Sequence, residues 1–293
     1  MADTEIRTPI VTPFDEDEAV DTEALAALVD HLIEEQGVTG LVPCGTTGEM
    51  GALTDAERRE VVETVVDAAD GRVPVMAGVG ETAVGDVLDH VSASAEAGAD
   101  SALVVAPYFG GDAPAEGNEA FFRAIADGSE LPVYLYNIPP AVGQDIDEDT
   151  VVALADHDNV AGVKDSSGDV TYFNSLIRRT PDDFEVYQGW DGAYAPSLSM
   201  GADGGINALT HFFGDVYAEV AEAIEDGDVE GARELQLGVI DEVFEACREH
   251  GFAPATKAVL AEQGVIRSGS VRPPLQAVPD DEAAELAAFV GDQ

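Results

Sequence analysis

The chain has 293 residues, among them 59 acidic and 13 basic side chains, and its formal net charge is −46 at pH 7. This length is sufficient for one large α/β barrel or for two ordinary domains. So negative a field repels nucleic acids and anionic membranes, and we expect neither as a partner. The acidic residues are interleaved with regularly spaced apolar ones, and 45% of the chain is hydrophobic, which favours a folded protein with an acidic surface over a disordered one.

The basic residues include only two lysines. Acid excess and lysine depletion together indicate adaptation to a high-salt cytoplasm, where ionic screening acts over about 3 Å at molar salt. We therefore expect the protein to lose stability in dilute buffer, because its surface charges then repel one another. Thermal unfolding from dilute buffer to molar KCl tests this expectation, and a constant midpoint would contradict the halophilic interpretation.

The cysteines and histidines give no pattern of a disulfide or a metal site. Cys44 and Cys247 are far apart in sequence and lie among apolar residues, as small buried side chains do. The five histidines lack the spacing of a ligand pair. The N-terminus carries no charged-then-apolar signal, and no apolar run approaches the roughly 20 residues that span a bilayer. We expect no metal, no other cofactor, no membrane association and a cytoplasmic location.

Short β-rich runs alternate with helical patterns along most of the chain. One helix opens with the capping box Thr54-Asp55-Ala56-Glu57. The expected strands are 6–11, 40–43, 74–79, 101–106, 133–136, 160–164, 184–187 and 204–206, and further helices are expected near 21–32, 86–97, 118–126, 147–155, 172–178 and 194–200. Eight β/α repeats predict a parallel (β/α)8 TIM barrel, with a doubly wound open sheet as the alternative.

After the eighth strand the pattern becomes entirely helical. Apolar residues recur at helical spacing in 216–223, 232–243, 256–262 and 282–290, which predicts three or four closing helices. No Pro/Ser-rich linker separates this part from the rest. We therefore interpret 1–210 as the catalytic barrel and 211–293 as a C-terminal helical extension.

One of the two lysines, Lys164, ends a short apolar run that reads as a buried strand. Partial desolvation at that place favours the neutral amine, which is a nucleophile. Attack on a ketone gives a Schiff base, and its iminium accepts the electrons of a breaking or forming C–C bond. A structural lysine paired with Asp165 or another acid is the alternative.

In a parallel barrel the functional side chains gather at the carboxyl ends of the strands. Tyr136 ends the fifth expected strand, and the turn Gly45-Thr46-Thr47-Gly48-Glu49 follows the second. The turn offers backbone N–H groups and two hydroxyls to a small carboxylate, although an ordinary βα turn has the same composition. The phenol of Tyr136 can both donate and accept a proton, and an interior aromatic is the alternative.

Six short motifs occur in order along nearly the whole chain. They are Thr12-Pro13-Phe14, Gly45-Thr46-Thr47-Gly48-Glu49, Pro107-Tyr108, Tyr136-Asn137-Ile138-Pro139, Gly162-Val163-Lys164-Asp165 and Arg272-Pro273-Pro274-Leu275. Together they resemble the dihydrodipicolinate synthase and N-acetylneuraminate lyase family of pyruvate-dependent class I aldolases. The resemblance implies a (β/α)8 barrel with a helical C-terminal part, usually a homotetramer, that binds a small-molecule keto acid covalently without a cofactor.

The same resemblance implies roles for individual residues. Lys164 is the expected Schiff-base lysine and Tyr136 the expected proton shuttle. Thr46 and Thr47 are expected to hold the pyruvate carboxylate, and Thr47 is counted among the catalytic residues. Asp191 resembles a lyase position that contacts sugar hydroxyls, and a helix N-cap is its alternative role. Further residues expected to bind substrate are Gly48, Tyr108, Gly189 and Ile206.

The chain departs from the family pattern in two places. Members that make dihydrodipicolinate typically carry an arginine where Ala141 stands here, and a second tyrosine where Phe109 stands. Loss of a guanidinium that pairs with a carboxylate weakens the synthase interpretation. The loop 139–143 is more similar to that of the archaeal 2-keto-3-deoxygluconate aldolases.

A phosphate on the substrate would need a cation at the site. No lysine or arginine lies between Arg72 and Arg123, so the loop after the fourth strand brings none. Such a cation could still come from Arg7, Arg267 or Arg272, or from a neighbouring subunit. The sequence therefore favours a substrate without phosphate.

We predict a class I aldolase that cleaves a 2-keto-3-deoxy sugar acid, such as 2-keto-3-deoxygluconate, to pyruvate and an aldehyde. The 6-phosphate of that acid stays open as a substrate. The alternatives are 4-hydroxy-tetrahydrodipicolinate synthase, which condenses pyruvate with aspartate semialdehyde, a dehydratase that uses the same imine, and a non-catalytic barrel that binds a keto acid.

Overall fold

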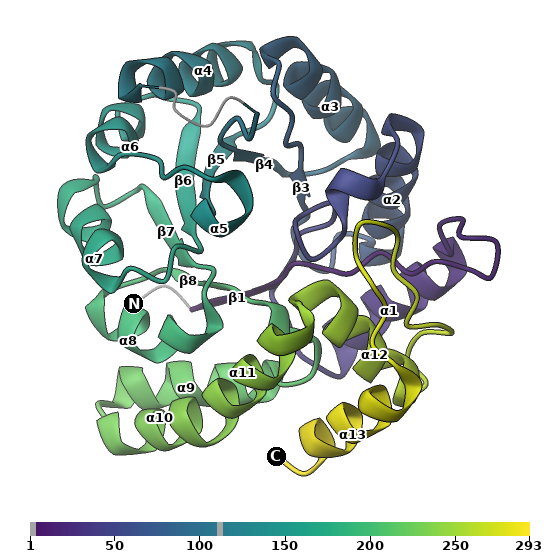
Figure 1. Cartoon of the computed structure of the whole chain (residues 1–293). Coiled ribbons are helices and arrows are strands. Elements are labelled where there is room, and N and C mark those ends of the chain that lie inside the picture. The colour runs from purple at the N-terminus through teal and green to yellow at the C-terminus, as the bar shows by residue number, and fades with distance from the viewer. Residues whose placement is uncertain (1–3, 110–113) are drawn as a thin grey trace.

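The computed structural model describes residues 4–109 and 114–293, in which eight parallel strands form a barrel ringed by helices (Figure 1). The strands are β1 (Glu5–Thr8), β2 (Gly40–Leu41), β3 (Met76–Gly78), β4 (Ser101–Val105), β5 (Val133–Asn137), β6 (Val160–Asp165), β7 (Glu185–Gln188) and β8 (Gly204–Ile206). They lie in the order β2-β1-β8-β7-β6-β5-β4-β3, and a parallel bridge between Leu41 and Val75 joins the two ends. The predicted (β/α)8 TIM barrel is confirmed, and the open sheet is excluded by this closure.

The helices that follow the eight strands agree with the predicted alternation. They are α1 (Thr22–Glu34), η1 (Met50–Ala52), α2 (Asp55–Ala69), α3 (Val84–Ala97), α4 (Ala115–Gly128), α5 (Pro139–Val142), α6 (Glu148–Ala155), α7 (Val170–Arg179), η2 (Asp191–Ala193), α8 (Tyr194–Met200) and η3 (Ala208–His211). The Thr54 capping box forms as predicted, with both halves hydrogen-bonded. The short helix α5 was not predicted, because four residues are too few to give a periodic pattern.

The strands are buried on both faces, so they read as nearly continuous apolar runs. In β5 every residue is buried, and in β6 only Ala161 is partly exposed. The register pairs Tyr136 with Lys164 across these two strands, near their carboxyl ends. The strands thus bring both predicted catalytic residues to the same end of the barrel.

The chain after η3 is mostly helical, and in Figure 1 these helices lie along one side of the barrel. They are α9 (Gly214–Asp226), α10 (Val229–Leu235), the π-helical turn η4 (Gln236–Ile240), α11 (Asp241–His250), α12 (Phe252–Glu262) and α13 (Asp280–Gly291). A second apolar core joins them to the barrel, with Ile6 of β1 and Tyr194 of α8 packed among their buried side chains. The proposed division at residue 210 falls within η3 and stays a prediction.

The two cysteines are free and buried, as predicted, and burial raises the pKa of both thiols to about 12. Within residues 4–109 and 114–293, no helix is long and apolar enough to cross a membrane. The same ranges contain no group of three or more His, Cys, Asp or Glu side chains placed to hold a metal ion.

Candidate active site

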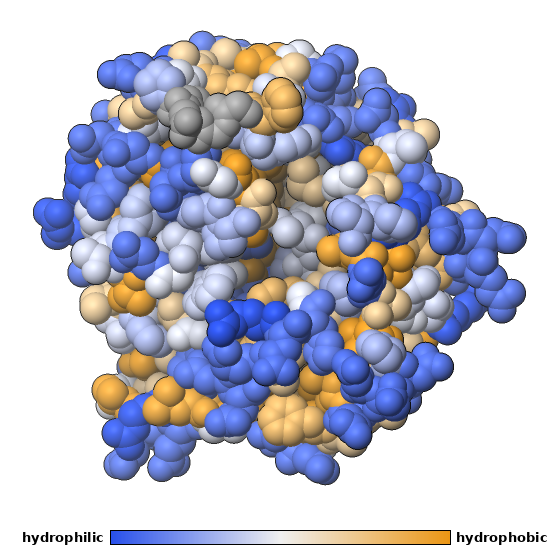
Figure 2. Space-filling view, in the orientation of Figure 1, coloured by the Kyte–Doolittle hydropathy of each residue, from blue (hydrophilic) through white to orange (hydrophobic). Residues whose placement is uncertain are grey.

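The carboxyl ends of the strands open into a cavity of about 560 Å³, a size typical of small-molecule sites. Figure 2 shows the hollow at the centre of this face. Residues that follow β1, β2, β5, β6, β7 and β8 line it, and the C-terminal helices α11 and α12 complete the wall. The cavity therefore depends on both the barrel and the helices that follow it.

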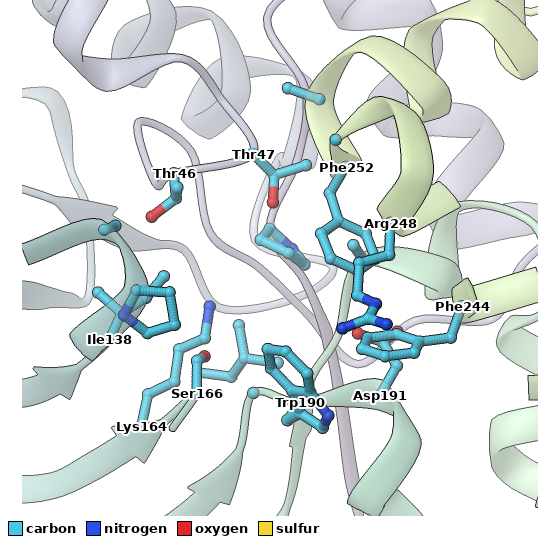
Figure 3. Close-up of a pocket in the computed structure, with 18 of the residues that line it drawn as sticks. Thr46, Thr47, Ile138, Lys164, Ser166, Trp190, Asp191, Phe244, Arg248 and Phe252 are labelled. Carbon is cyan, nitrogen blue, oxygen red and sulfur yellow. The ribbon is translucent and has the colours of Figure 1, made fainter. Parts of the chain in front are cut away.

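Lys164 lies at the carboxyl end of β6 and points into this cavity (Figure 3). Its side chain is buried, with 4% exposure, and Nζ is 4.4 Å from the centroid of the Tyr136 ring. Among the described residues no carboxylate forms an ion pair with Lys164. A desolvated amine without a counter-ion is suited to nucleophilic attack.

Asp165, the acid next in sequence, is turned away from the lysine. Its carboxylate accepts hydrogen bonds from Asn137 Nδ2 at 2.8 Å and from the Ser167 hydroxyl at 2.9 Å. Burial raises the pKa of Asp165 to about 6, although these hydrogen bonds oppose the change. The alternative interpretation of Lys164 as the partner of Asp165 is therefore wrong.

The turn after β2 brings two hydroxyls to the cavity, those of Thr46 and Thr47. Oγ1 of Thr46 lies 3.4 Å from the Tyr136 hydroxyl. Two non-glycine residues with positive φ bracket the turn, Cys44 at 56° and Glu49 at 58°. Such backbone conformations persist only where the surrounding structure holds them, and they are common next to functional sites.

A buried ion pair next to this turn supports it. Glu49 is paired with Lys257 of α12, the second lysine of the chain, and both side chains are fully buried. The other carboxylate oxygen of Glu49 accepts the backbone N–H of Arg272 at 2.9 Å. Nζ of Lys257 also lies 3.9 Å from the centroid of the Phe14 ring, and burial lowers the pKa of this lysine to about 8. The Thr-Pro-Phe and Arg-Pro-Pro motifs thus meet at the support of the turn.

Gly189 and Ser166 lie next to Lys164 in the cavity wall. A Cβ on Gly189 would stand 2.1 Å from Ser166 Oγ and 2.7 Å from Lys164 Cε, so only glycine leaves room for both. Ser166 Oγ is buried and has no hydrogen-bond partner in the described chain. Sequence reasoning missed Ser166. Side chains two residues apart on a strand point to the same side, so its position two residues after Lys164 could have indicated it.

Asp191 and Ile206 line the cavity, as expected from the resemblance. One oxygen of Asp191 accepts hydrogen bonds from the Tyr217 hydroxyl at 2.6 Å and from Leu209 N at 3.0 Å, and burial raises the pKa of this carboxyl. Asp191 is not the N-cap of its own helix, since η2 begins after Trp190 without a side-chain cap, and Leu209 lies in the first turn of η3. The N-cap alternative is therefore wrong, and Asp191 also ties the β8 loop to α9.

Two residues expected at the site lie outside the cavity. The side chain of Tyr108 is 42% exposed, and its hydroxyl donates to Glu81 at 2.9 Å. Gly48 is packed against the backbone, where a Cβ would stand 2.9 Å from Ile10 O, and its own carbonyl accepts from the Thr12 hydroxyl at 2.8 Å. Gly48 therefore shapes the turn without facing the ligand space.

The arginines considered for a phosphate also lie outside the cavity. Arg7 is buried with its guanidinium 4.7 Å from the centroid of the Tyr187 ring. Arg267 and Arg272 form ion pairs elsewhere, with Asp21 at 3.0 Å and with Glu57 at 2.6 Å respectively. Among the described arginines, Arg248 of α11 lines the cavity. Sequence reasoning missed it because it lies on a helix after the barrel and not at the end of a strand.

The cavity thus joins a lysine that no described carboxylate pairs with, a tyrosine ring against it and two threonine hydroxyls, and comparison with known proteins shows the family. The family model described as "Dihydrodipicolinate synthetase family" matches residues 3–293. The chain belongs to this family. It is therefore a lyase of the class I pyruvate aldolase type, in which a lysine forms a Schiff base with pyruvate and no metal or other cofactor takes part.

Relatives and solved structures cover the whole length of the chain. A 4-hydroxy-tetrahydrodipicolinate synthase of Oceanobacillus iheyensis is 36% identical, over 98% of this chain and 96% of the relative. The crystal structure of a dihydrodipicolinate synthase from Bacillus anthracis matches with a TM-score of 0.94 at 34% identity, covering 100% of this chain and 99% of the other. YagE of E. coli, a member of the dihydrodipicolinic acid synthase family solved in complex with pyruvate, matches with a TM-score of 0.92 at 30% identity and the same coverage.

Proposed function

We propose that the protein is an aldolase that cleaves a 2-keto-3-deoxy sugar acid, such as 2-keto-3-deoxygluconate or its 6-phosphate, to pyruvate and an aldehyde. The observation that carries this proposal is the buried hydroxyl of Ser166, which has no hydrogen-bond partner within residues 4–109 and 114–293 and lies beside Lys164. A buried polar group without a partner is costly, and a hydroxyl of a bound sugar acid would satisfy it. Ala141, which lines the cavity where synthases typically carry an arginine, supports the same conclusion.

The reaction follows from the places of four side chains. Thr46 and Thr47 hold the carboxylate of the keto acid, and Lys164 attacks its keto carbon and expels water to give a protonated imine. The hydroxyl that reacts is on the second carbon beyond the imine carbon, and Tyr136 takes its proton. The bond between this carbon and the methylene group next to the imine then breaks. The hydroxyl oxygen becomes the aldehyde oxygen, and the electrons of the bond enter the imine. Protonation and hydrolysis of the resulting enamine release pyruvate and free Lys164.

The second candidate is 4-hydroxy-tetrahydrodipicolinate synthase, the name that the O. iheyensis relative carries. It uses the same imine in the opposite direction, adding pyruvate to aspartate semialdehyde. The replacement of the arginine by Ala141 speaks against it, because the second carboxylate of the product then lacks its typical partner.

Both reactions are tested with the purified protein in molar KCl. We expect pyruvate release from 2-keto-3-deoxygluconate or its 6-phosphate at a kcat/KM well above that for condensation of pyruvate with aspartate semialdehyde. Release by the wild type establishes the sugar-acid aldolase. Efficient condensation with aspartate semialdehyde and no release from either sugar acid would replace it with the synthase.

We further propose a homotetramer in a high-salt cytoplasm. The large apolar side chain of Phe109 is 88% exposed in the single chain, next to the 42% exposed Tyr108, and such neighbours suit a contact between subunits. Light scattering after size-exclusion chromatography in molar KCl gives the mass, and a monomer at micromolar concentration would contradict this proposal.

A further inference from the structure

We propose that Asn137 and Asp165 are positioning residues that hold the loop after β5, residues 138–147, in place as part of the cavity wall. Neither side chain is among the described ones that line the cavity, and neither takes part in the proposed reaction steps. They act on catalysis through the loop that they hold. The inference rests on the proposed Schiff base at Lys164 and holds for either candidate reaction.

The two side chains lie behind the cavity wall. Asn137 and Asp165 are partners in the register of β5 and β6, and each is the last residue of its strand. The preceding residues, Tyr136 and Lys164, line the cavity. Side chains one residue apart on a strand point to opposite faces, so the pair points away from the ligand space. Both residues are buried, with 0% and 1% exposure.

One hydrogen-bond network joins this pair to the loop. Asn137 Nδ2 donates to Oδ1 of Asp165 at 2.8 Å, and Asn137 Oδ1 accepts the backbone N–H of Ile146 at 2.9 Å. The same carboxylate accepts the backbone N–H of Ser167 at 3.1 Å and the Ser167 hydroxyl at 2.9 Å. Asn137 therefore links the far end of the loop after β5 to the start of the loop after β6.

The loop needs such links because it cannot keep its shape alone. Its helix α5 has four residues and no side-chain cap hydrogen bond at its N-terminus. So short a helix is stable only through tertiary contacts. The loop brings Ile138, Pro140 and Ala141 to the cavity wall, and Ile138 lies close to Lys164 in Figure 3. A shift of the loop therefore changes the space next to the imine.

Two other side chains also attach this loop. The Tyr172 hydroxyl donates to Ile146 O at 2.8 Å, and Gln144 Nε2 donates to Pro107 O at 2.6 Å. These bonds connect the loop to α7 and to the segment after β4. The bonds of Asn137 instead connect it to β6, the strand that ends beside the reacting amine. Loss of the pair should therefore displace the wall relative to the imine and leave the loop attached to the protein.

The first variant is Asn137→Ala, which removes both hydrogen bonds of the side-chain amide. Its matched control is Asn159→Ala. Asn159 directly precedes β6, so it lies at the amino end of the barrel, opposite the cavity. Its amide donates to the carbonyl groups of Ala126, Ser129 and Leu131 at 3.0, 3.0 and 3.2 Å, and the control thus also removes an amide that joins separate segments.

A second pair of variants separates the hydrogen bonds of Asp165 from its charge. In Asp165→Asn the side-chain oxygen can still accept from Asn137 and from the Ser167 N–H, and the new amide can donate to the Ser167 hydroxyl. Asp165→Ala removes all of these bonds. The conservative variant should therefore keep the function that the alanine variant loses.

The measurements are kcat and KM for the substrate that the wild type turns over, and the pyruvate concentration that half-saturates borohydride trapping, both in molar KCl. We expect Asn137→Ala and Asp165→Ala to lower kcat/KM about 10-fold or more, because a displaced wall misplaces the substrate. Half-saturation by pyruvate should stay near the wild-type value, since Thr46, Thr47 and Lys164 are not on this loop. Asp165→Asn and Asn159→Ala should stay within about threefold of the wild-type kcat/KM.

Hydrogen exchange followed by mass spectrometry gives a readout that does not depend on activity. A peptide that contains Ile146 should exchange faster in Asn137→Ala than in the wild type, and at the wild-type rate in Asn159→Ala. Equal losses of kcat/KM in these two variants would overturn the proposal, as would equal losses in the two Asp165 variants or unchanged exchange at Ile146. Should the alanine variants fail to fold, the nearly isosteric Asp165→Asn decides, because a large loss of kcat/KM in it overturns the proposal by itself.

The same preparations separate this inference from the proposed function. If borohydride traps pyruvate on the wild type and the variants of Asn137 and Asp165 behave like it, the inference about the pair is wrong and the aldolase chemistry stands. If borohydride traps no pyruvate on the wild type, the proposed chemistry fails, and the role of the pair in catalysis fails with it.

Discussion

Replacement of Lys164 by alanine is expected to abolish both turnover and the covalent capture of pyruvate. Nζ of Lys164 is the atom that would carry the imine, and the alanine variant has no amine there. Because Lys164 forms no ion pair with a described carboxylate, its removal leaves no buried acid without a partner, so the fold should survive. Borohydride reduction in the presence of pyruvate, followed by mass spectrometry, should show the adduct on the wild type and none on Lys164→Ala.

The matched control for this variant is Tyr136→Phe, which removes one hydroxyl from the ring that lies against Lys164. This variant should still trap pyruvate, since the nucleophile is intact, while its kcat falls by about 10² to 10⁴ through loss of the proton transfer. Turnover or trapping at wild-type level in Lys164→Ala would refute the assigned role of the lysine. An unchanged kcat in Tyr136→Phe would remove the tyrosine from the mechanism.

Replacement of Lys257 by methionine is expected to destabilise the protein by about 3–5 kcal/mol, because it leaves the carboxylate of Glu49 buried without its counter-ion. The effect should extend to ligand binding. Glu49 follows directly on the turn that carries Thr46 and Thr47, and its backbone N–H donates to Thr46 O at 3.1 Å. We expect the pyruvate concentration that half-saturates borohydride trapping to rise several-fold. Urea unfolding in molar KCl gives the free energy of unfolding.

Two further variants separate the ion pair from a general loss of packing. Adding Glu49→Gln to Lys257→Met removes the orphan charge and keeps an acceptor for the Arg272 N–H, so part of the lost stability should return. Arg233→Ala, which breaks an exposed pair, should change stability by less than about 0.5 kcal/mol. If Lys257→Met lowers stability but leaves the half-saturation unchanged, Lys257 supports the fold alone and does not position the turn.

Sequence reasoning did not predict the orientation of side chains that is set by contacts with distant parts of the chain. Tyr108 belongs to a family motif, yet its hydroxyl is held by Glu81, so its side chain lies at the surface of the single chain. The π-helical turn η4 lies just before α11, and its Gln236 donates to Asp191 O at 3.1 Å and accepts from Ala195 N at 2.9 Å. These contacts, which join segments more than 40 residues apart in sequence, help to seat the helix that carries Arg248.

The sequence by itself determined the barrel, the order of its strands and the meeting of Lys164, Tyr136 and the threonine turn. The physical reason is that parallel strands of alternating β/α units close in chain order and present their carboxyl ends at one face, so residues at strand ends must converge. The tertiary structure alone decided that Arg248 lines the cavity, that Ser166 has no hydrogen-bond partner among the described residues and that the second lysine supports the turn through Glu49. The places of Arg248 and Lys257 depend on how the C-terminal helices pack against the barrel, and no local periodicity encodes that packing.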